Sequence, residues 1–440
     1  MKHRFRFTSL ALVLLGACDA PSTMMMDGDA GPLPMTTLRT GAPVTFEPVY
    51  EATSYAAGGG VTREWLPVDL AVHPDGELWL VQRMERDPAY DDDTECTERG
   101  LAGNPSDCVS LQGSTVAITE PSAAEPASEA NGRANLVVDA NSWHFMRRPS
   151  SIAFGDPALP FEPTDPGAAD ANVTETQTYQ NTFATCHEHA TGNNTDGGAF
   201  IGPSLWTADR SIYNGVNGSF EWSNGSHLDM VHATQYCMGI AYEGANAYWT
   251  FNGAEGALDR YDFGAPHYPG HHDHDDGDVT RFYLPEGDEL SRLPYVPSNM
   301  VLSGASLFVA DTGNGRVLRF DIASPGIEVG TFRTFESIDA TAMEGIGYQV
   351  LADAAVLGAA WGGASEPSGL ALLDAETLVV ASHATGHITL LELDGTVIRT
   401  IDTGTGEGPG GLTVLDGRVY FVQMNERRVY RMDVMAPAAE

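Results

Sequence analysis

A pattern of strand, turn and strand recurs along the chain and limits the fold more than any other feature. Its clearest copy spans residues 307–321, where an apolar segment, a turn containing Gly313 and a second apolar segment follow one another. The other copies are residues 378–388, 419–429 and 248–262, and the first strand alone is matched by residues 182–186 and 78–82. Internal repeats of this size indicate one structural unit used several times.

Each copy is preceded by a further short apolar segment, which makes six units. These segments are residues 68–72, 151–154, 238–242, 299–302, 369–372 and 411–414. Short strands rich in Val, Leu, Tyr and Phe, separated by Gly and Asp turns, cannot bury both faces alone and stack radially. The sequence therefore predicts an all-β chain, with a six-bladed β-propeller over residues 43–435. A seven-bladed ring and an open β-sandwich are the alternatives.

The last unit shows only three strands and ends near residue 433. Residues 44–50 alternate in the manner of a strand. Because an unpaired strand edge invites aggregation, we expect this N-terminal strand to complete the last blade and close the ring.

The repeat resembles that of NHL-type propellers. Residues 367–371 read Pro-Ser-Gly-Leu-Ala, and residues 309–317 read Val-Ala-Asp-Thr-Gly-Asn-Gly-Arg-Val. The resemblance covers residues 64–434, is strong in the last four units and is weak in the first two. NHL-type amidating lyases carry metal-binding histidines beside the start of the inner strands. Here those places hold Val68, Ser150, Met238, Ser368 and Gly410, which argues against amidating-lyase activity.

The first 17 residues have the pattern of an export signal. Lys2, Arg4 and Arg6 precede a short apolar segment, residues 10–15, which is too short to span a bilayer. Residues 15–18, Leu-Gly-Ala-Cys, resemble the lipobox of bacterial lipoproteins, which implies lipidation of Cys18; a plain secretory signal is the alternative. We expect residues 18–42 to form a flexible tether, and the protein to be exported and anchored by its lipid to the bacterial cell envelope.

The charge of the chain narrows its partners. There are 60 acidic and 23 basic residues, giving a formal charge of −37, and Lys2 is the only lysine. Loss of residues 1–17 would leave 20 Arg and a charge of −40. Such a field repels nucleic acid and attracts cations. No P-loop and no Cys-x-x-Cys-His motif is present, so we expect neither a nucleotide nor a haem cofactor. We expect a monomeric propeller with a small-molecule or protein ligand.

The cysteines predict disulfides. Apart from Cys18, an even number remains, which in an exported protein favours bridges with three alternative pairings. Cys96 and Cys108 share one Gly- and Asp-containing insertion and are expected to pair locally. That leaves Cys186 to pair with Cys237.

Histidines near the inner strands of the second and third units predict a metal site. We call the face where the inner strands begin the top face. His144 and His232 each lie eight residues before an isoleucine of an inner strand, and His187 and His189 lie in the top loop of the second unit. Imidazole favours zinc or copper. The alternative is that these histidines are hydrogen-bonded groups in a polar channel mouth.

Residues 267–278 form the densest cluster of His and Asp in the chain, which includes His272 and His274. They fall between the third and fourth strands of the third unit. We therefore expect them on the bottom face, on the opposite side of the ring from His232. Imidazole with carboxylate suits zinc, and the Asp-rich part suits calcium.

Two functions follow from these patterns. The first is a ligand-binding or scaffolding module with a metal ion at the top channel mouth. The second is a metal-dependent hydrolase, lyase or oxidoreductase that uses a His-ligated metal. No complete set of catalytic residues is visible, and fold alone implies no catalysis.

Overall fold

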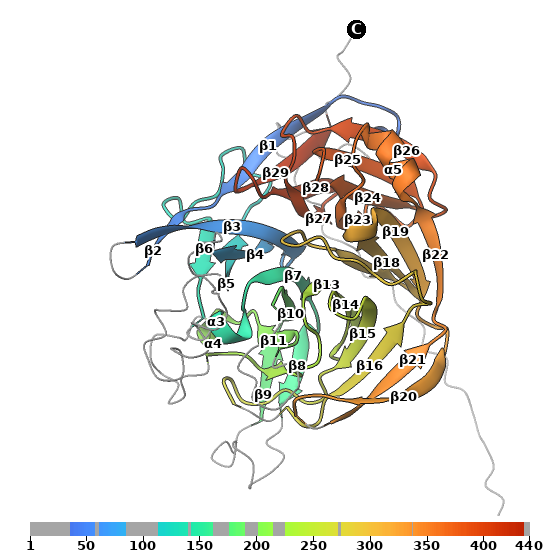
Figure 1. Ribbon diagram of the computed structural model, residues 1–440. Helices are drawn as coiled ribbons and strands as arrows, with labels where there is room; N and C mark the ends of the chain where they lie inside the picture. The colour runs from blue at the N-terminus through green and yellow to red at the C-terminus, as the bar shows by residue number, and fades with distance from the viewer. Residues whose placement is uncertain are drawn as a thin grey trace, which may run out of the picture.

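A computed structural model shows six sheets arranged as blades around a central channel (Figure 1). The structure describes residues 36–57, 61–84, 113–139, 142–161, 176–189, 201–213, 225–271, 274–336 and 338–434. The prediction of an all-β six-bladed propeller is confirmed. The innermost strand of each blade overlaps one of the six predicted apolar segments.

Each blade is an antiparallel sheet whose strands follow the chain outward. Blade 1 holds β3 (Val61–Val72), β4 (Leu78–Met84), β5 (Gly113–Ile118) and β6 (Ala134–Val137), with β2 (Ser54–Ala57) paired to the start of β3. Blade 2 holds β7 (Pro149–Phe154), β10 (Thr182–His187), β11 (Ser204–Thr207) and β12 (Asp229–Met230); β8 (Ala158–Phe161) and β9 (Gln177–Gln180) form a separate hairpin. Blade 3 holds β13 (Cys237–Gly244), β14 (Ala247–Asn252), β15 (Ala257–Asp262) and β16 (Asp278–Tyr283).

The second half of the ring is more regular. Blade 4 holds β17 (Met300–Ser303), β18 (Ser306–Asp311), β19 (Arg316–Asp321) and β22 (Gly347–Ala352), and blade 5 holds β23 (Pro367–Leu372), β24 (Thr377–Ser382), β25 (His387–Glu392) and β26 (Val397–Asp402). Blade 6 holds β27 (Pro409–Leu415), β28 (Arg418–Gln423), β29 (Arg428–Val434) and β1 (Val44–Glu51). β1 pairs antiparallel with β29, so the predicted closure of the ring by an N-terminal strand is confirmed.

Blade 3 is extended by a hairpin that belongs, in sequence, to blade 4. β20 (Ile327–Arg333) and β21 (Asp339–Glu344) lie between β19 and β22 along the chain, and β21 pairs in parallel with β16. The sheet of blade 3 therefore continues outward through β21 and β20. The chain passes from β19 of blade 4 into this hairpin on the outer wall of the ring and returns to blade 4 at β22 (Figure 1).

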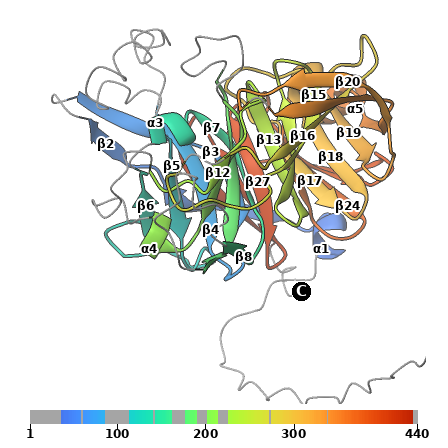
Figure 2. The ribbon, with the colours of Figure 1, turned by 90° about the horizontal axis from the view of Figure 1, so that it is seen from below.

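Helices are short and lie outside the blades. In the described part of the chain they are α1 (Thr36–Arg39), α3 (Ser142–Phe145), α4 (Arg210–Tyr213), the single-turn η4 (Thr312–Asn314) and α5 (Ala354–Trp361). Leu38 of α1 is buried against blades 5 and 6, so packing begins before residue 42, where the tether was expected to end. Seen from the side, α3 and α1 lie at opposite faces of the ring (Figure 2). Within the described ranges, no helix is long and apolar enough to cross a membrane.

The core lies between the faces of neighbouring blades. Val379 and Ala381 of blade 5 share one buried cluster with Leu412 and Phe421 of blade 6. Alternate residues of each strand enter such clusters because side chains of a strand point to opposite faces. Full burial of one Val, Leu or Phe side chain contributes about 1.5–3 kcal/mol, and every pair of blades repeats this packing.

Candidate metal centre and central channel

Blades 2 and 3 are joined by a disulfide. Cys186, near the end of β10, bonds to Cys237, the first residue of β13, and their Cα atoms are 5.1 Å apart. This is the pairing expected from the sequence. It fixes the top of β10 beside the top of β13, and so holds the histidines that follow Cys186 near those that precede Cys237.

His187 and His189 are fully buried beside this disulfide. Burial, and to a smaller extent the nearby Arg147, lower the pKa of His187 to about 3, so its imidazole is neutral. The Nδ1 of His189 lies 3.4 Å from a guanidinium nitrogen of Arg147, which can only donate, so this Nδ1 accepts. Both rings are buried polar groups beside the disulfide.

Two groups of side chains come close enough to share a metal ion, and both contain His274. One is His227, His267 and His274, and the other is His232, His274 and Glu336; within each group the ligand atoms lie within 4.8 Å of one another. We call these five residues the seam cluster. Among the residues that the structure describes, neither group contains His187 or His189. The structure therefore brings together His232 and His274 from the predicted sites.

The expectation that His232 and His274 lie on different faces is wrong. The segment between β15 and β16 starts at the bottom but runs along the outer edge of blade 2. The backbone N of His267 donates to Leu228 O and that of Gly270 to His227 O, both at 2.9 Å. These bonds carry the segment to the seam between blades 2 and 3, where the residues flanking β12 already lie.

The seam cluster is almost completely shielded from solvent. The four histidines are 0–6% exposed, and the side chain of Glu336 is 5% exposed. Glu336 comes from the turn between β20 and β21. It accepts hydrogen bonds from the backbone N and the Nδ1 of His232, and the backbone N of Phe335 donates to His232 O at 3.2 Å. The hairpin inserted in blade 4 thus covers the cluster.

The tautomer of His267 directs a lone pair into the cluster. Its Nδ1 lies 2.7 Å from the carbonyl oxygen of Tyr268, which can only accept, so Nδ1 carries the proton. Its Nε2 then faces the Nε2 of His274 at 3.2 Å. Two nitrogens bound to one tetrahedral zinc ion, at about 2.0–2.1 Å each, lie about 3.4 Å apart. In this structure the pair forms a hydrogen bond in which His274 Nε2 donates to His267 Nε2, and its spacing is also close to that of two ligands of a single ion.

Several predicted site residues lie outside the described part of the chain. These are Cys18, Cys96, Cys108 and His272, and for His144, which lies in α3, only the backbone is described. His383, which directly follows β24, donates from Nδ1 to Pro409 O at 3.0 Å and lines a cavity at the top of the ring.

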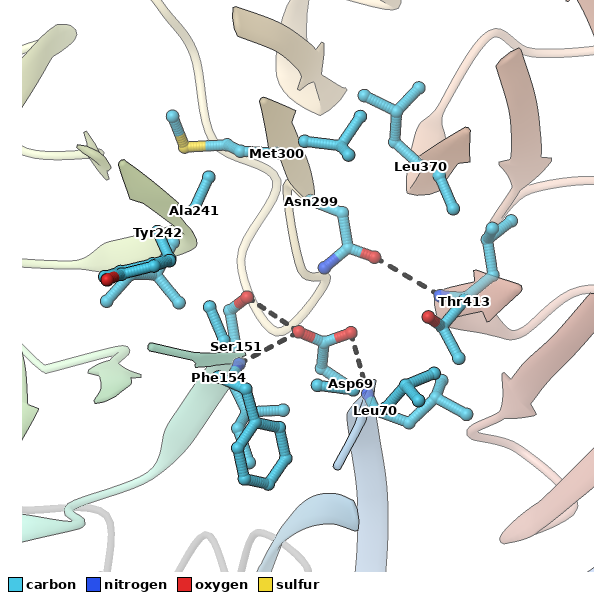
Figure 3. Close-up of a pocket in the computed structure, with 18 of the residues that line it drawn as sticks. Asp69, Leu70, Ser151, Phe154, Ala241, Tyr242, Asn299, Met300, Leu370 and Thr413 are labelled. Atoms are coloured by element: carbon cyan, nitrogen blue, oxygen red, sulfur yellow. Dashed lines mark hydrogen bonds between the residues drawn. The ribbon is translucent and has the colours of Figure 1, made fainter. Parts of the chain in front are cut away.

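A second site, in the channel itself, is centred on Asp69 of β3. Its carboxylate accepts hydrogen bonds from Ser151 Oγ at 2.6 Å, and from the backbone N of Ile152 and Leu70 at 3.0 and 2.8 Å (Figure 3). Burial raises the pKa of Asp69 to about 6 in spite of these bonds. A Cβ at position 411 would lie 1.8 Å from Asp69 Oδ1, so glycine is required there.

Asn299 lies beside Asp69 and accepts from the backbone N of Leu412 at 3.3 Å (Figure 3). A cavity of about 290 Å³ follows the inner strands from this polar layer toward the bottom face. Because its pKa lies near 6, Asp69 can exchange a proton near neutral pH. The chain thus holds a titratable carboxyl in the lining of a channel cavity.

Sequence reasoning missed several of these residues. A carboxylate inside the apolar segment 68–72 marks Asp69 as a buried polar group that needs partners. His267 belongs to the predicted His and Asp cluster but was not selected from it. Nothing local to His227 or Glu336 in the sequence shows that they meet, because their segments come from different blades.

No protein-family model and no curated protein matches the chain. Among solved structures, virginiamycin B lyase from Staphylococcus aureus aligns over 89% of this chain and 99% of its own, with 10% identity and a TM-score of 0.42. An auxiliary nutrient binding protein from Bacteroides thetaiotaomicron aligns over 89% and 76%, with 10% identity and a TM-score of 0.46. Both are propellers, and the likeness concerns the fold alone.

Proposed function

We propose that this protein is an exported, lipid-anchored propeller that acts as a metal-binding module, with one transition-metal ion held at the seam of blades 2 and 3. The observation that carries the proposal is the approach of His267 Nε2 to His274 Nε2, 3.2 Å, inside a buried group that also contains His227, His232 and Glu336. In the absence of a cation, only hydrogen bonds such as those of His232, His267 and His274 offset the cost of moving these imidazoles out of water.

The donor set favours zinc or copper(II). It is rich in imidazole and has one carboxylate, whereas calcium takes six to eight oxygen ligands. The thiols of Cys186 and Cys237 are joined in the disulfide and are therefore not thiolate donors. The hydrogen bond from His267 Nδ1 to a backbone carbonyl is the second contact that metal-bound histidines usually make.

Burial of the cluster favours binding over catalysis. Structural metal sites are closed by protein ligands, whereas catalytic sites keep one position open to water or substrate. Five candidate ligands, none with a side chain more than a few per cent exposed, leave little access for substrate. The alternative, a metal-dependent hydrolase, lyase or oxidoreductase, would need such an open position.

Export is supported by two independent features. The N-terminal segment has a basic, apolar and Cys-containing pattern, and the disulfide between blades suits an oxidising compartment. The tether would leave the propeller free to face its ligand away from the membrane.

The test is metal analysis of the protein purified without a histidine tag after expression with added zinc or copper. We expect one equivalent of metal, retained on dialysis and removed by a strong chelator. His274→Ala, which affects both groups of ligands, is expected to abolish binding, and His387→Ala, on blade 5, is the matched control. The proposal fails if the wild-type chain holds no stoichiometric metal, or if the two variants bind equally well.

A further inference from the structure

The mouth of the channel at the top face contains a cavity of about 570 Å³. Blade 1 contributes Leu66, Arg83 and Met84, and blade 5 contributes His383. Leu66 precedes Asp69 on β3 by three residues, so this cavity lies above the polar layer of the lower channel cavity. It shares no lining residue with the seam cluster.

The charge of this lining is opposite to that of the chain. Arg83, Arg148 and Arg427 contribute to it, and Arg427 also forms an ion pair with Glu64. No Asp or Glu is among the described residues that line the cavity, although the chain carries a net charge of −37. A concave wall of one charge focuses the local field and raises the concentration of counter-ions. The cavity is thus a positive site in a negative molecule.

Arg83 is held in place by groups behind the cavity wall. Its two terminal nitrogens donate to Glu188 at 2.8 Å and to the carbonyl oxygen of Tyr295 at 2.6 Å. Glu188 also accepts from Arg292 at 2.9 Å and from the backbone N of Tyr295 at 2.8 Å. One carboxylate therefore serves two guanidinium groups, which leaves an excess of positive charge beside the cavity.

The backbone around the cavity is strained. Arg148, Tyr295 and Arg427 have φ angles of 46°, 70° and 58°, and they are three of the nine non-glycine residues with positive φ in the described ranges. Each such residue costs on the order of 1 kcal/mol or more, and such residues gather at ligand sites where the fold fixes a side chain direction. This is an observation independent of the charge.

Apart from Tyr295 and Asn425, the remaining wall is apolar. Met84, Val296 and Met424 line it, with Leu66 and Pro294. A pocket with apolar walls and a few convergent polar groups suits a small organic molecule, and arginine is the residue that best pairs with carboxylate and similar oxyanions.

We propose that the top-face cavity binds a small organic anion with an apolar body, a carboxylate or sulfonate attached to an aromatic or aliphatic group. The arginines receive the anionic group and the methionines contact the apolar body. This gives the binding module a ligand class, and it stands independently of the metal at the seam.

The test uses anilinonaphthalene sulfonate, a fluorescent organic anion, with neutral N-phenylnaphthylamine as the matched probe without the sulfonate. We expect one saturable site for the anion and at least tenfold weaker binding of the neutral probe. Arg148→Met and Arg427→Met are each expected to weaken anion binding about tenfold, as the loss of one charge-assisted contact does. Arg333→Met, on the exposed strand β20, is the matched control.

Equal binding of the two probes, or unchanged binding by both arginine variants, would overturn the proposal. Near-ultraviolet circular dichroism of each variant shows whether it is folded, and Arg427→Lys, which keeps the charge, should bind better than Arg427→Met. The titration is run with and without bound metal. If the wild-type protein holds no stoichiometric metal but binds the anion, only the metal proposal is rejected. If it holds the metal but does not bind the anion, only the anion proposal is rejected.

Discussion

Glu336 contacts His232 across 104 residues of sequence and from a different blade, accepting hydrogen bonds from both its backbone N and its ring. The carboxylate therefore fixes the orientation of the imidazole and makes Nδ1 the protonated nitrogen. It also ties the β20–β21 hairpin to the seam of blades 2 and 3.

The Glu336→Gln variant should bind zinc about tenfold to a hundredfold more weakly, because loss of a carboxylate partner lowers the basicity and order of a ligand histidine. Competition with a chromophoric chelator measures this change. Glu344→Gln, at the exposed end of the same hairpin, is expected to bind as the wild type does. Equal affinity in the two variants would show that Glu336 has no part in the metal site.

Removal of the Cys186–Cys237 disulfide should lower the free energy of unfolding by about 4 kcal/mol, since the bridge closes a loop with a sequence separation of 51 residues in the unfolded chain. The double variant Cys186→Ala with Cys237→Ala tests this by urea unfolding. Thiol labelling of the denatured wild type should leave both cysteines unmodified. Labelling of either would contradict the pairing.

The buried carboxyl of Asp69 should make stability depend on pH. Its pKa is raised from 3.8 to about 6, so the folded protein holds the proton more tightly than the unfolded chain does. Stability from this group is therefore greatest below about pH 4 and falls by about 3 kcal/mol as the pH rises to about 6 and beyond.

The Asp69→Asn variant should remove that pH dependence, even though its amide cannot accept every bond that the carboxylate accepts. The measurement is the difference in unfolding free energy between acidic and neutral buffers, compared with wild type. Exposed Asp416→Asn changes the net charge equally and should leave the dependence as it was. A slope unchanged in Asp69→Asn would place the titration on another group.

A chain lacking β1 should lose its closed ring. Val49 and Tyr50 are buried against blades 1 and 6, and without β1 the strand β29 has an open edge. We expect a lower melting temperature and oligomers detectable by light scattering. A chain that begins at Thr36 keeps β1 and serves as the control; similar behaviour of the two would show that closure does not depend on β1.

The sequence predicts the ring well because the fold repeats a local pattern. Each inner strand is an apolar segment between Gly or Asp turns, so residues such as Val68 or Leu370 can be placed without knowledge of their neighbours. The pairing of Cys186 with Cys237 was expected because Cys96 and Cys108 share one insertion, and the bond joins neighbouring blades 2 and 3.

The candidate site could be predicted only in part, because it depends on the path of segments outside the repeat. His232 was placed by its distance from an inner strand, but the segment that carries His267 and His274 leaves blade 3 and bonds to the edge of blade 2. Glu336 lies close to His232 because β21, which follows it in the chain, pairs in parallel with β16. Neither path leaves a periodic signature in the sequence.

The same pairing has a consequence for how the ring comes apart. In most repeat proteins a unit contacts only its neighbours and stability is nearly a sum of local terms. Here β21 is hydrogen-bonded to blade 3 while the chain on either side of the hairpin belongs to blade 4. Blade 4 cannot open without removing the outer edge of blade 3, so amide hydrogens in β16, β19 and β22 should exchange together, as one cooperative unit.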